Sequence, residues 1–384
     1  MHPSPTSRIR VVVVIDTLAH GGAERCAVDM ASALDPAAFD VHVVVTRTGG
    51  PLRGVLDEHG VRCTVLGRRR RFDLKATLRL RRLVRNADVV HAHKFGSGAW
   101  ACALAGGTPV FVHEHNWSGS FSVVDSMLYR HLVGRRAQRV FCVSRSVSDR
   151  LAALGVDEAS IELLPNAVAV VEPLQRTAAR RALDVDLDAP TIGMVAGLRP
   201  EKAHDLALAA LAQPELVARG ARLCAIGSGP EAERLRELAR SFGVDDRVDW
   251  RDRVDDVELG GATRSAGTAY AAAFDVALVC SDWEGLPLFA LEAMVAGTPL
   301  VATRVGELPA LCAEGRGWLV PTRDVAAITR ALAEVLDAGD TVAARAGAAK
   351  QHVRSTHAFD VLVAELEAHL GQPPRSDSSK ELAA

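Results

Sequence analysis

The 384-residue sequence predicts an α/β protein with two doubly wound domains. Short, β-branched apolar runs such as residues 8–15 alternate with longer stretches of helical composition, as expected for repeated βα units with buried parallel strands. A chain of this length exceeds what one hydrophobic core usually serves, and a new series of such units starts at Thr191. Ligands of doubly wound sheets bind at the carboxyl ends of the strands, so we examine the residues that follow each predicted strand.

Composition agrees with a globular α/β protein. Apolar residues make up 48% of the chain and charged residues 24%. The seven cysteines form no Cys-x-x-Cys pair, which favours small core residues in a reducing compartment. The first apolar run, Val11–Ile15, is too short for a signal peptide or a membrane span, and we expect a cytoplasmic protein.

In the first domain the strand over residues 8–15 leads into Gly21-Gly22-Ala-Glu24 and a helix over 25–34. Two glycines between a first strand and a first helix let the backbone approach a ligand closely, although the Gly-x-Gly-x-x-Gly dinucleotide pattern is absent. A basic helix is expected over 74–84. Further strands are predicted at 40–46, 61–66, 88–93, 108–116, 140–144 and 161–168.

Four histidines stand at the ends of two of these strands: His91, His93, His113 and His115. They admit a structural and a functional interpretation. His-x-His occurs twice, which suits a metal cluster, but apart from Glu114 no carboxylate pair or thiolate completes a well-spaced ligand set. We therefore predict no metal site.

In the second domain the strand from Thr191 is followed by Arg199 and Lys202, two cations that could neutralise a diphosphate. A strand over 222–226 leads into Gly227-Ser-Gly229, and a short strand from Val248 leads into a loop with Arg253. Residues 258–269 are expected to form a flexible insertion to which no role is assigned.

The most informative stretch is Ser281–Gly297, which follows an apolar strand over 274–280. Pro287 fits the first position of a helix that Gly297 ends, with Glu284 in the loop and Glu292 inside the helix. Free N–H groups at a helix start and the helix dipole attract an anion. A phosphate there would lie between two glutamates able to accept hydroxyl hydrogen bonds, which describes a nucleotide sugar. An ordinary strand–helix unit with solvated glutamates is the alternative.

Glu284 and Glu292, within Glu-Gly-Leu-Pro and Leu-Glu-Ala-Met, resemble the nucleotide-sugar motif of retaining GT-B glycosyltransferases of family 4, and the resemblance covers most of the chain. It implies two Rossmann-like domains facing across a cleft. It also implies that Glu292 binds ribose and that Glu284 approaches the donor sugar. The diphosphate would receive backbone N–H groups from the residues between them, Gly285, Leu286, Pro287, Leu288 and Phe289.

Weaker motifs resemble the family in the expected order. They place Gly21 and Gly22 beside the donor phosphate and acceptor, Gly227 and Gly229 near the nucleotide, and the segment of Arg253 opposite the base. A histidine near the sugar and its leaving phosphate is implied, with His93 the first choice and His113 the second. Lys202 matches a diphosphate-binding lysine. Gly197 stands where the family usually has arginine, so Arg199 is expected to supply that charge.

We expect the domains to divide as follows: residues 1–170 bind the acceptor, 171–357 bind the nucleotide sugar, a helix over 358–371 can cross back to the first domain, and 372–384 form a disordered tail.

Charge is divided unevenly. Residues 1–170 hold 22 Lys and Arg against 15 Asp and Glu, and Arg68–Arg85 contains nine cations and one acid. Two interpretations explain this pattern equally well. Either the cations lie on solvent-exposed helix faces, or they bind an anionic membrane surface or a lipid-linked phosphate acceptor. Nucleic acid is not expected, since aromatic residues are 4% of the chain and Phe72 is the one aromatic residue within Arg68–Arg85.

The resemblance implies transfer of a sugar from a nucleotide-diphosphate sugar to a hydroxyl acceptor with retention of configuration. Cell-surface polysaccharide or glycolipid synthesis at the inner membrane face is the expected setting, without a metal or other cofactor. A GT-B sugar-nucleotide epimerase and a nucleotide-sugar-binding protein without turnover are the alternatives. A glycosidase fits less well, because the helix start between the glutamates suits a phosphate better than a water.

Overall fold

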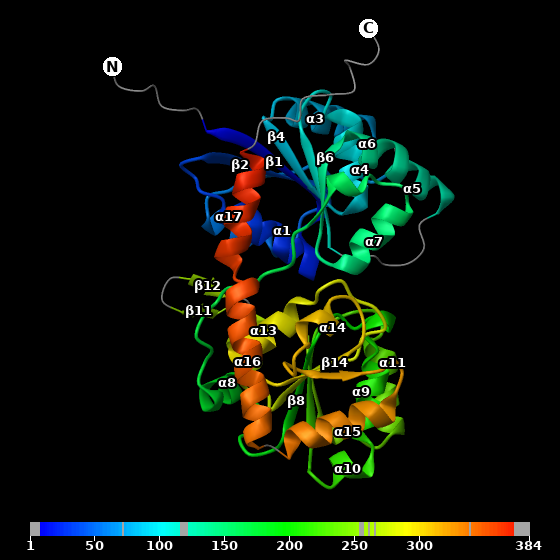
Figure 1. Ribbon diagram of the computed structural model, residues 1–384, viewed down its shortest axis with the longest axis vertical. Coiled ribbons are helices and arrows are strands. Elements are labelled where there is room, and N and C mark those ends of the chain that lie inside the picture. The colour runs from blue at the N-terminus through cyan, green and yellow to red at the C-terminus, as the bar shows by residue number, and fades with distance from the viewer. Residues whose placement is uncertain are drawn as a thin grey trace. The chain divides into compact units, whose positions relative to one another are not determined.

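The computed structural model describes residues 8–70, 73–115, 122–252, 257–259, 262–264, 266–337 and 339–371. It divides into two compact units (Figure 1). The first unit comprises Met1–Pro165 and Leu362–Ala384, and the second comprises Asn166–Val361. Each unit carries a parallel sheet with helices, so the predicted α/β class with two domains is confirmed. The predicted disordered tail, 372–384, lies outside the described residues.

The first unit is built on a seven-stranded parallel sheet in the order β3-β2-β1-β4-β5-β6-β7. Its strands are β1 (Ile9–Thr17), β2 (Phe39–Thr48), β3 (Arg62–Val65), β4 (Val89–His93), β5 (Val110–Glu114), β6 (Ala137–Cys142) and β7 (Ile161–Leu163). The chain moves outward from β1 through β2 and β3, then returns to pair β4 with the other side of β1. The strand order therefore reverses between β1 and β4.

The helices of the first unit connect these strands. They are α1 (Gly22–Ala33), α2 (Arg53–Glu58), α3 (Leu74–Arg85), α4 (Lys94–Leu104), α5 (Val123–Leu128), α6 (Gly134–Arg136) and α7 (Arg145–Ala153), with a π turn at Tyr129–Val133 and a 3₁₀ turn at Glu158–Ser160. The last helix, α17 (Phe359–Leu370), begins in the second unit and belongs to the first from Leu362. The Asp35 N–H donates to Glu367 at 2.7 Å, and His369 lies 3.0 Å from Glu162, which ties this helix to the first unit.

The second unit carries a six-stranded parallel sheet in the order β10-β9-β8-β13-β14-β15. Its strands are β8 (Thr191–Val195), β9 (Arg222–Ile226), β10 (Val248–Arg251), β13 (Val276–Val279), β14 (Leu300–Thr303) and β15 (Trp318–Val320). A separate antiparallel pair joins β11 (Val257–Leu259) to β12 (Ala262–Arg264). Here the strand order reverses between β8 and β13.

The helices of the second unit are α8 (Arg176–Ala182), α9 (His204–Leu211), α10 (Pro214–Val217), α11 (Ala232–Ser241), α12 (Ala266–Ala271), α13 (Leu288–Ala296), α14 (Leu308–Leu311), α15 (Val325–Leu336) and α16 (Asp340–Thr356). Two 3₁₀ turns occupy Pro200–Lys202 and Asp245–Arg247.

Alternation along the strands divides the core of the second unit into two layers. On β9, Leu223 and Ala225 pack with α9, α10, α11 and α15, whereas Cys224 and Ile226 pack with α8, α13, α14 and α16. Both faces of the sheet are therefore covered by helices (Figure 1), which is why its strands are nearly continuous apolar runs.

Several local expectations differ from the structure. The strand predicted over 161–168 ends at Leu163. The helix of the central motif begins at Leu288, because Pro287 has an extended ψ of 129° and stands at the N-cap. Part of the predicted insertion is helical, since α12 begins at Ala266. The sixth strand starts earlier than predicted, at Ala137, because β6 pairs along the full length of β5. No described helix is long and apolar enough to cross a bilayer.

A buried arginine joins α8 to the sheet of the second unit. The Arg180 side chain is 1% exposed and donates to the carbonyls of Ala273, Asp186, Leu187 and Ala189 at 2.8–3.1 Å. Its Nη2 also donates to the Asp275 carboxylate at 2.6 Å. These partners offset the cost of burying the guanidinium, and they fix the segment before β8 to the residues before β13.

Replacing Arg180 is expected to destabilise the second unit. Arg180→Ala should lower the free energy of unfolding by about 3 kcal/mol, because it removes a charged donor from four carbonyls and from a partly buried carboxylate. Urea denaturation measures the change. Arg181→Ala, at an exposed position of the same helix, should stay within about 0.5 kcal/mol of the wild-type value. Equal effects of the two substitutions would contradict the structural role of Arg180.

Candidate functional site

The residues of the central motif lie at the point where the strand order of the second unit reverses. β8 pairs with β13 through Ile192 and Val276. The loops that follow these two strands carry Lys202 and Glu284, and the Asp282 N–H donates to the Glu201 carbonyl at 2.9 Å between them. Ligands of doubly wound sheets bind at such reversal points, outside the carboxyl ends of the strands.

Lys202 and Glu284 form an ion pair at this point. The Lys202 ammonium donates to Glu284 Oε1 at 2.6 Å, and the side chains of Lys202 and Glu284 are 20% and 5% exposed. The Ser281 hydroxyl donates to the same oxygen at 2.7 Å. A carboxylate this deeply buried is stable only when it is paired and hydrogen-bonded, and both conditions are met here.

The start of α13 lies directly after this pair. Its N-cap, Pro287, makes no side-chain capping bond, so the first N–H groups of the helix, including those of Leu288 and Phe289, remain for a ligand. The preceding loop is held from two sides. The Glu307 N–H donates to the Gly285 carbonyl at 2.9 Å, and the Asn166 amide donates to the Leu286 carbonyl at 2.7 Å. The helix start is thereby a preorganised site for an anion.

Glu292 lies about one turn into α13 and is 7% exposed. Its carboxylate lies against Gly267 of α12, where a Cβ atom would overlap the carboxylate oxygens. Glycine at this position therefore leaves room for the glutamate. The contact gives the end of the predicted insertion a structural role that the sequence did not reveal.

Gly227 and Gly229 line the neighbouring loop after β9. Gly227 has φ +149°, and a Cβ atom there would overlap the Ala196 carbonyl after β8. A Cβ atom at Gly229 would overlap the Leu198 carbonyl, so the two loops are in backbone contact. Arg199 is exposed at the start of the Pro200–Lys202 turn. Arg253 lies outside the described residues.

Two further groups at this edge were missed by sequence reasoning. Arg323, in the left-handed region with φ +57°, donates to Asp282 Oδ1 at 2.6 Å and to Asp205 at 3.1 Å. It thus fixes the loop between Ser281 and Glu284. Asn166 follows β7 in sequence yet supports the central motif. Sequence spacing does not reveal the role of either residue, because each is far along the chain from the segment that it contacts.

In the first unit the glycine-rich loop lies where the strand order reverses between β1 and β4. Gly21 is the N-cap of α1, and a Cβ atom there would overlap the carboxylate of Glu24. Gly22 is the first residue of the helix. Glu24, 8% exposed, forms an ion pair with Lys94, which follows β4 and has φ +70°. The predicted loop therefore meets the end of the strand that carries His93.

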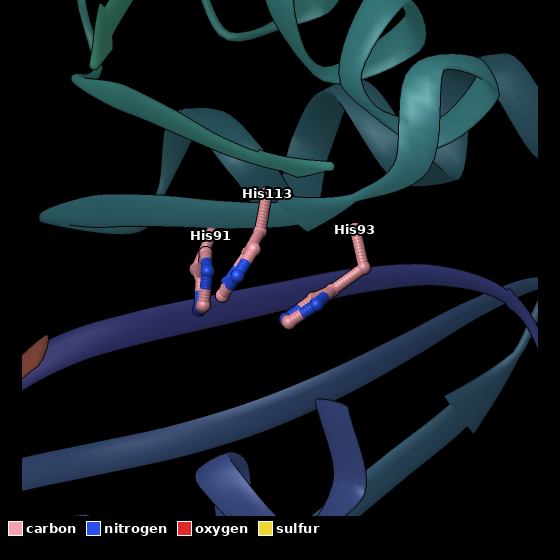
Figure 2. Close-up of side chains that lie close together, drawn as sticks. All are labelled: His91, His93 and His113. Carbon is pink, nitrogen blue, oxygen red and sulfur yellow. The ribbon is translucent and has the colours of Figure 1, made fainter. Parts of the chain in front are cut away.

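His91, His93 and His113 lie on one face of β4 and β5, because alternate residues of a strand face the same side, and His115 follows β5 directly. His93 and His113 are opposite each other in the register. His91, His93 and His113 are at most 1% exposed, and Figure 2 shows their rings on the same side of the sheet. The ring centroids of His93 and His113 are 5.5 Å apart, and His93 Nδ1 lies 2.8 Å from His115 Nε2 in a hydrogen bond.

Burial keeps these imidazoles neutral. Desolvation, with smaller contributions from neighbouring groups, lowers the pKa of His91 and His93 well below the usual value, and desolvation lowers the pKa of His113 to about 3. One nitrogen from each of the three lies within 4.8 Å of the others. However, the rings of His93 and His113 are nearly parallel, at 22°, so their lone pairs do not converge. Binding one ion at about 2.0–2.1 Å would require the rings to rotate.

Glu114 projects to the other face of β5. It is 3% exposed and accepts a hydrogen bond from the Tyr129 hydroxyl at 2.8 Å. Burial raises the pKa of Glu114 to about 8, and the Tyr129 hydrogen bond opposes this effect only partly. The carboxyl group is therefore mostly protonated at neutral pH.

Two family models match the chain. One described as Glycosyltransferase Family 4 matches residues 20–171, and one described as Glycosyl transferases group 1 matches residues 189–338. A GDP-mannose-dependent alpha-(1-6)-phosphatidylinositol monomannoside mannosyltransferase from Mycobacterium tuberculosis is 30% identical over 311 residues, covering 75% of this chain and 77% of that protein. A 2-deoxystreptamine N-acetyl-D-glucosaminyltransferase from Streptomyces fradiae is 35% identical over 215 residues, 54% of this chain and 48% of that protein.

A solved structure with a similar fold is that of HepE from Anabaena in complex with UDP and glucose. The TM-score is 0.83 at 18% sequence identity, over 95% of this chain and 100% of that one. At this identity the likeness concerns the fold.

The raised pKa of Glu114 predicts a pH-dependent loss of stability. Between the ordinary glutamate pKa of 4.5 and the raised pKa of about 8, the folded protein keeps a proton that the unfolded chain has released, so stability falls as pH rises through this window. Glu114→Gln removes the fall and still accepts from Tyr129. The free energy of unfolding of Glu114→Gln should exceed that of the wild type by an amount that grows from pH 5 to pH 8 and reaches on the order of 4 kcal/mol. Urea denaturation across this range measures it. Glu158→Gln, at an exposed site, should show no such growth, and a pH-independent difference for Glu114→Gln would refute the assignment.

Proposed function

The chain belongs to glycosyltransferase family 4 and has the GT-B fold, and on this premise we propose that it moves a sugar from a nucleotide-diphosphate sugar to a hydroxyl acceptor with retention of configuration. The observation that carries the proposal is the Lys202–Glu284 ion pair beside the uncapped start of α13. A cation and a helix start suit a diphosphate, and the glutamate next to them suits sugar hydroxyls.

The charge that develops on the departing diphosphate is stabilised by groups already in place. Lys202, Arg199 and the N–H groups of Leu288 and Phe289 would face the phosphates, so their attraction grows as the bond to the sugar breaks. Gly285 and Leu286, just before Pro287, hold the helix start in position through the bonds that their carbonyls accept. We propose that these groups suffice and that turnover needs no metal ion.

Glu292 and Glu284 would bind the two hydroxyl-bearing ends of the donor. In this proposal Glu292 accepts from the ribose and Glu284 from the transferred sugar. In the first unit we favour His93 over His113 as the histidine near the sugar. His93 ends β4, the strand at which the order reverses, and it is the N-cap of α4, whereas His113 lies one strand further out.

We propose the class of acceptor from the names of two relatives. The mannosyltransferase is named for phosphatidylinositol monomannoside, and the N-acetyl-D-glucosaminyltransferase is named for 2-deoxystreptamine. Acceptors that contain a polyhydroxylated ring, free or lipid-linked, are therefore the first to test. This class agrees with synthesis of glycolipids or cell-surface polysaccharides.

We also propose that α3 binds an anionic membrane surface. Its inner face is buried through Ala76, Leu80 and Val84. On the outer side, Leu74 and Leu78 are 75% and 53% exposed. The cations Lys75, Arg79, Arg81, Arg82 and Arg85 are exposed as well. Exposed leucines among cations suit the boundary between lipid headgroups and acyl chains. Arg71, part of the same basic run, lies outside the described residues.

Donor binding and turnover test the site. We expect one of UDP-, GDP- or ADP-sugars to raise the melting temperature and to release nucleoside diphosphate, with or without chelator. Lys202→Ala should reduce kcat at least about 100-fold, since it removes the main stabilising charge. Glu292→Ala should abolish the thermal shift.

Arg240→Ala is the matched control, because Arg240 is an exposed cation on α11 of the same unit; its turnover should equal that of the wild type. Failure of every donor to bind would refute the proposed site. Conversion of the donor to an epimer without diphosphate release would refute transfer.

Membrane binding should depend on the charge of α3. The double substitution Arg79→Glu/Arg82→Glu should weaken sedimentation with vesicles containing about 30% phosphatidylserine by roughly 10- to 100-fold, since each cation contributes about 1 kcal/mol near such a surface. Salt should weaken wild-type binding in the same way. The control Arg240→Glu/Arg330→Glu changes two exposed cations of the second unit. An equal loss in both variants, or wild-type binding to neutral vesicles alone, would contradict the assignment to α3.

A further inference from the structure

We infer that Ser281 is a positioning residue for Glu284: its hydroxyl holds one carboxylate oxygen, so that the other oxygen is the one offered to the donor sugar. This inference rests on the proposed function, in which Glu284 accepts hydrogen bonds from that sugar. Ser281 itself is 2% exposed and is not expected to touch the substrate.

The two hydrogen bonds to Glu284 fall on the same atom. Ser281 Oγ donates to Oε1 at 2.7 Å and Lys202 Nζ donates to Oε1 at 2.6 Å. Among the described residues no hydrogen bond reaches Oε2. An ionised carboxylate accepts at both oxygens. The asymmetry therefore leaves Oε2 as the acceptor for a hydroxyl.

Lys202 alone cannot keep this arrangement when the donor binds. Its ammonium is at the end of a long, partly exposed side chain, and in the proposed reaction it turns toward the diphosphate. The serine has one side-chain torsion and is almost fully buried, so its bond to Glu284 persists. Ser281 is thus the partner that holds Glu284 in the same orientation before and after donor binding.

Ser281 is itself fixed to the sheet. Thr303, 0% exposed on β14, donates from its hydroxyl to the Ser281 carbonyl at 2.7 Å. β14 in turn pairs with β13 through Ala302 and Val279, and Val279 lies two residues before Ser281. A continuous series of contacts therefore links the rigid sheet, the Ser281 backbone and the Glu284 carboxylate. Positioning of this kind raises the rate of a bound substrate without adding a contact to it.

The test uses the full-length protein and the donor that the screen identifies. Ser281→Ala should lower kcat for release of nucleoside diphosphate by about 10- to 100-fold, the usual effect of losing a hydrogen bond to a charged group. The KM for the donor should change by less than about threefold, and binding of nucleoside diphosphate alone should be unchanged, because α13 and Lys202 are intact. Thr303→Val should lower kcat in the same direction by a smaller factor.

The control is Ser160→Ala, which removes another buried hydroxyl, one that donates to the Asp157 carbonyl in the first unit. Its kcat should match the wild type. Wild-type kcat in Ser281→Ala would overturn the positioning role and leave the proposed function intact. Loss of nucleoside-diphosphate binding in Ser281→Ala would also overturn it, because the whole site would then depend on the serine. Absence of donor binding in the wild type would instead refute the proposed function.

Discussion

The pairing of β8 with β13 is the constraint on which the candidate site depends. These strands are adjacent in the sheet because the chain first winds outward through β9 and β10 and then returns to the free side of β8. Their loops therefore meet although they are far apart in sequence. The meeting produces the Lys202–Glu284 pair and places it against the start of α13. The same reversal between β1 and β4 brings the glycine-rich loop, Glu24 and Lys94 together in the first unit.

Buried charge is handled in two different ways in this protein. Glu284 and Arg180 are charged groups with close partners on several sides, so pairing and hydrogen bonds offset the cost of removing them from water. Glu114 has the Tyr129 hydroxyl as its near partner, and burial raises its pKa until the neutral form dominates. The buried histidines follow the second course, because their neutral rings stack on one another and His113 contacts Phe141 edge-on. Neutral side chains thus fill the interior of the first unit around the ends of β4 and β5.

The site of the second unit is supported by side chains from outside the central motif. Thr303 holds Ser281, Arg323 holds Asp282, and Asn166 holds Leu286. Each of these side chains comes from a different loop or strand and acts on the backbone or carboxylates of one segment. The groups of this segment are therefore held in place before a substrate binds, which limits the entropy cost of binding.

The sequence alone determined the class of fold, the positions of most strands along the chain and the identity of the central motif. These features are local: β-branched runs, a helix start after a loop, and two glutamates eight positions apart are visible without tertiary contacts. Lys202 and Glu284 were predicted as site residues in this way, but their direct ion pair was not predicted. Asn166, Arg323 and the support of Ser281 by Thr303 also escaped, because they depend on which strands become neighbours. The start of α13 at Leu288 and the contact of Gly267 with Glu292 were decided by packing as well. Local pattern specifies which groups are present, whereas the pairing of distant strands decides which of them meet.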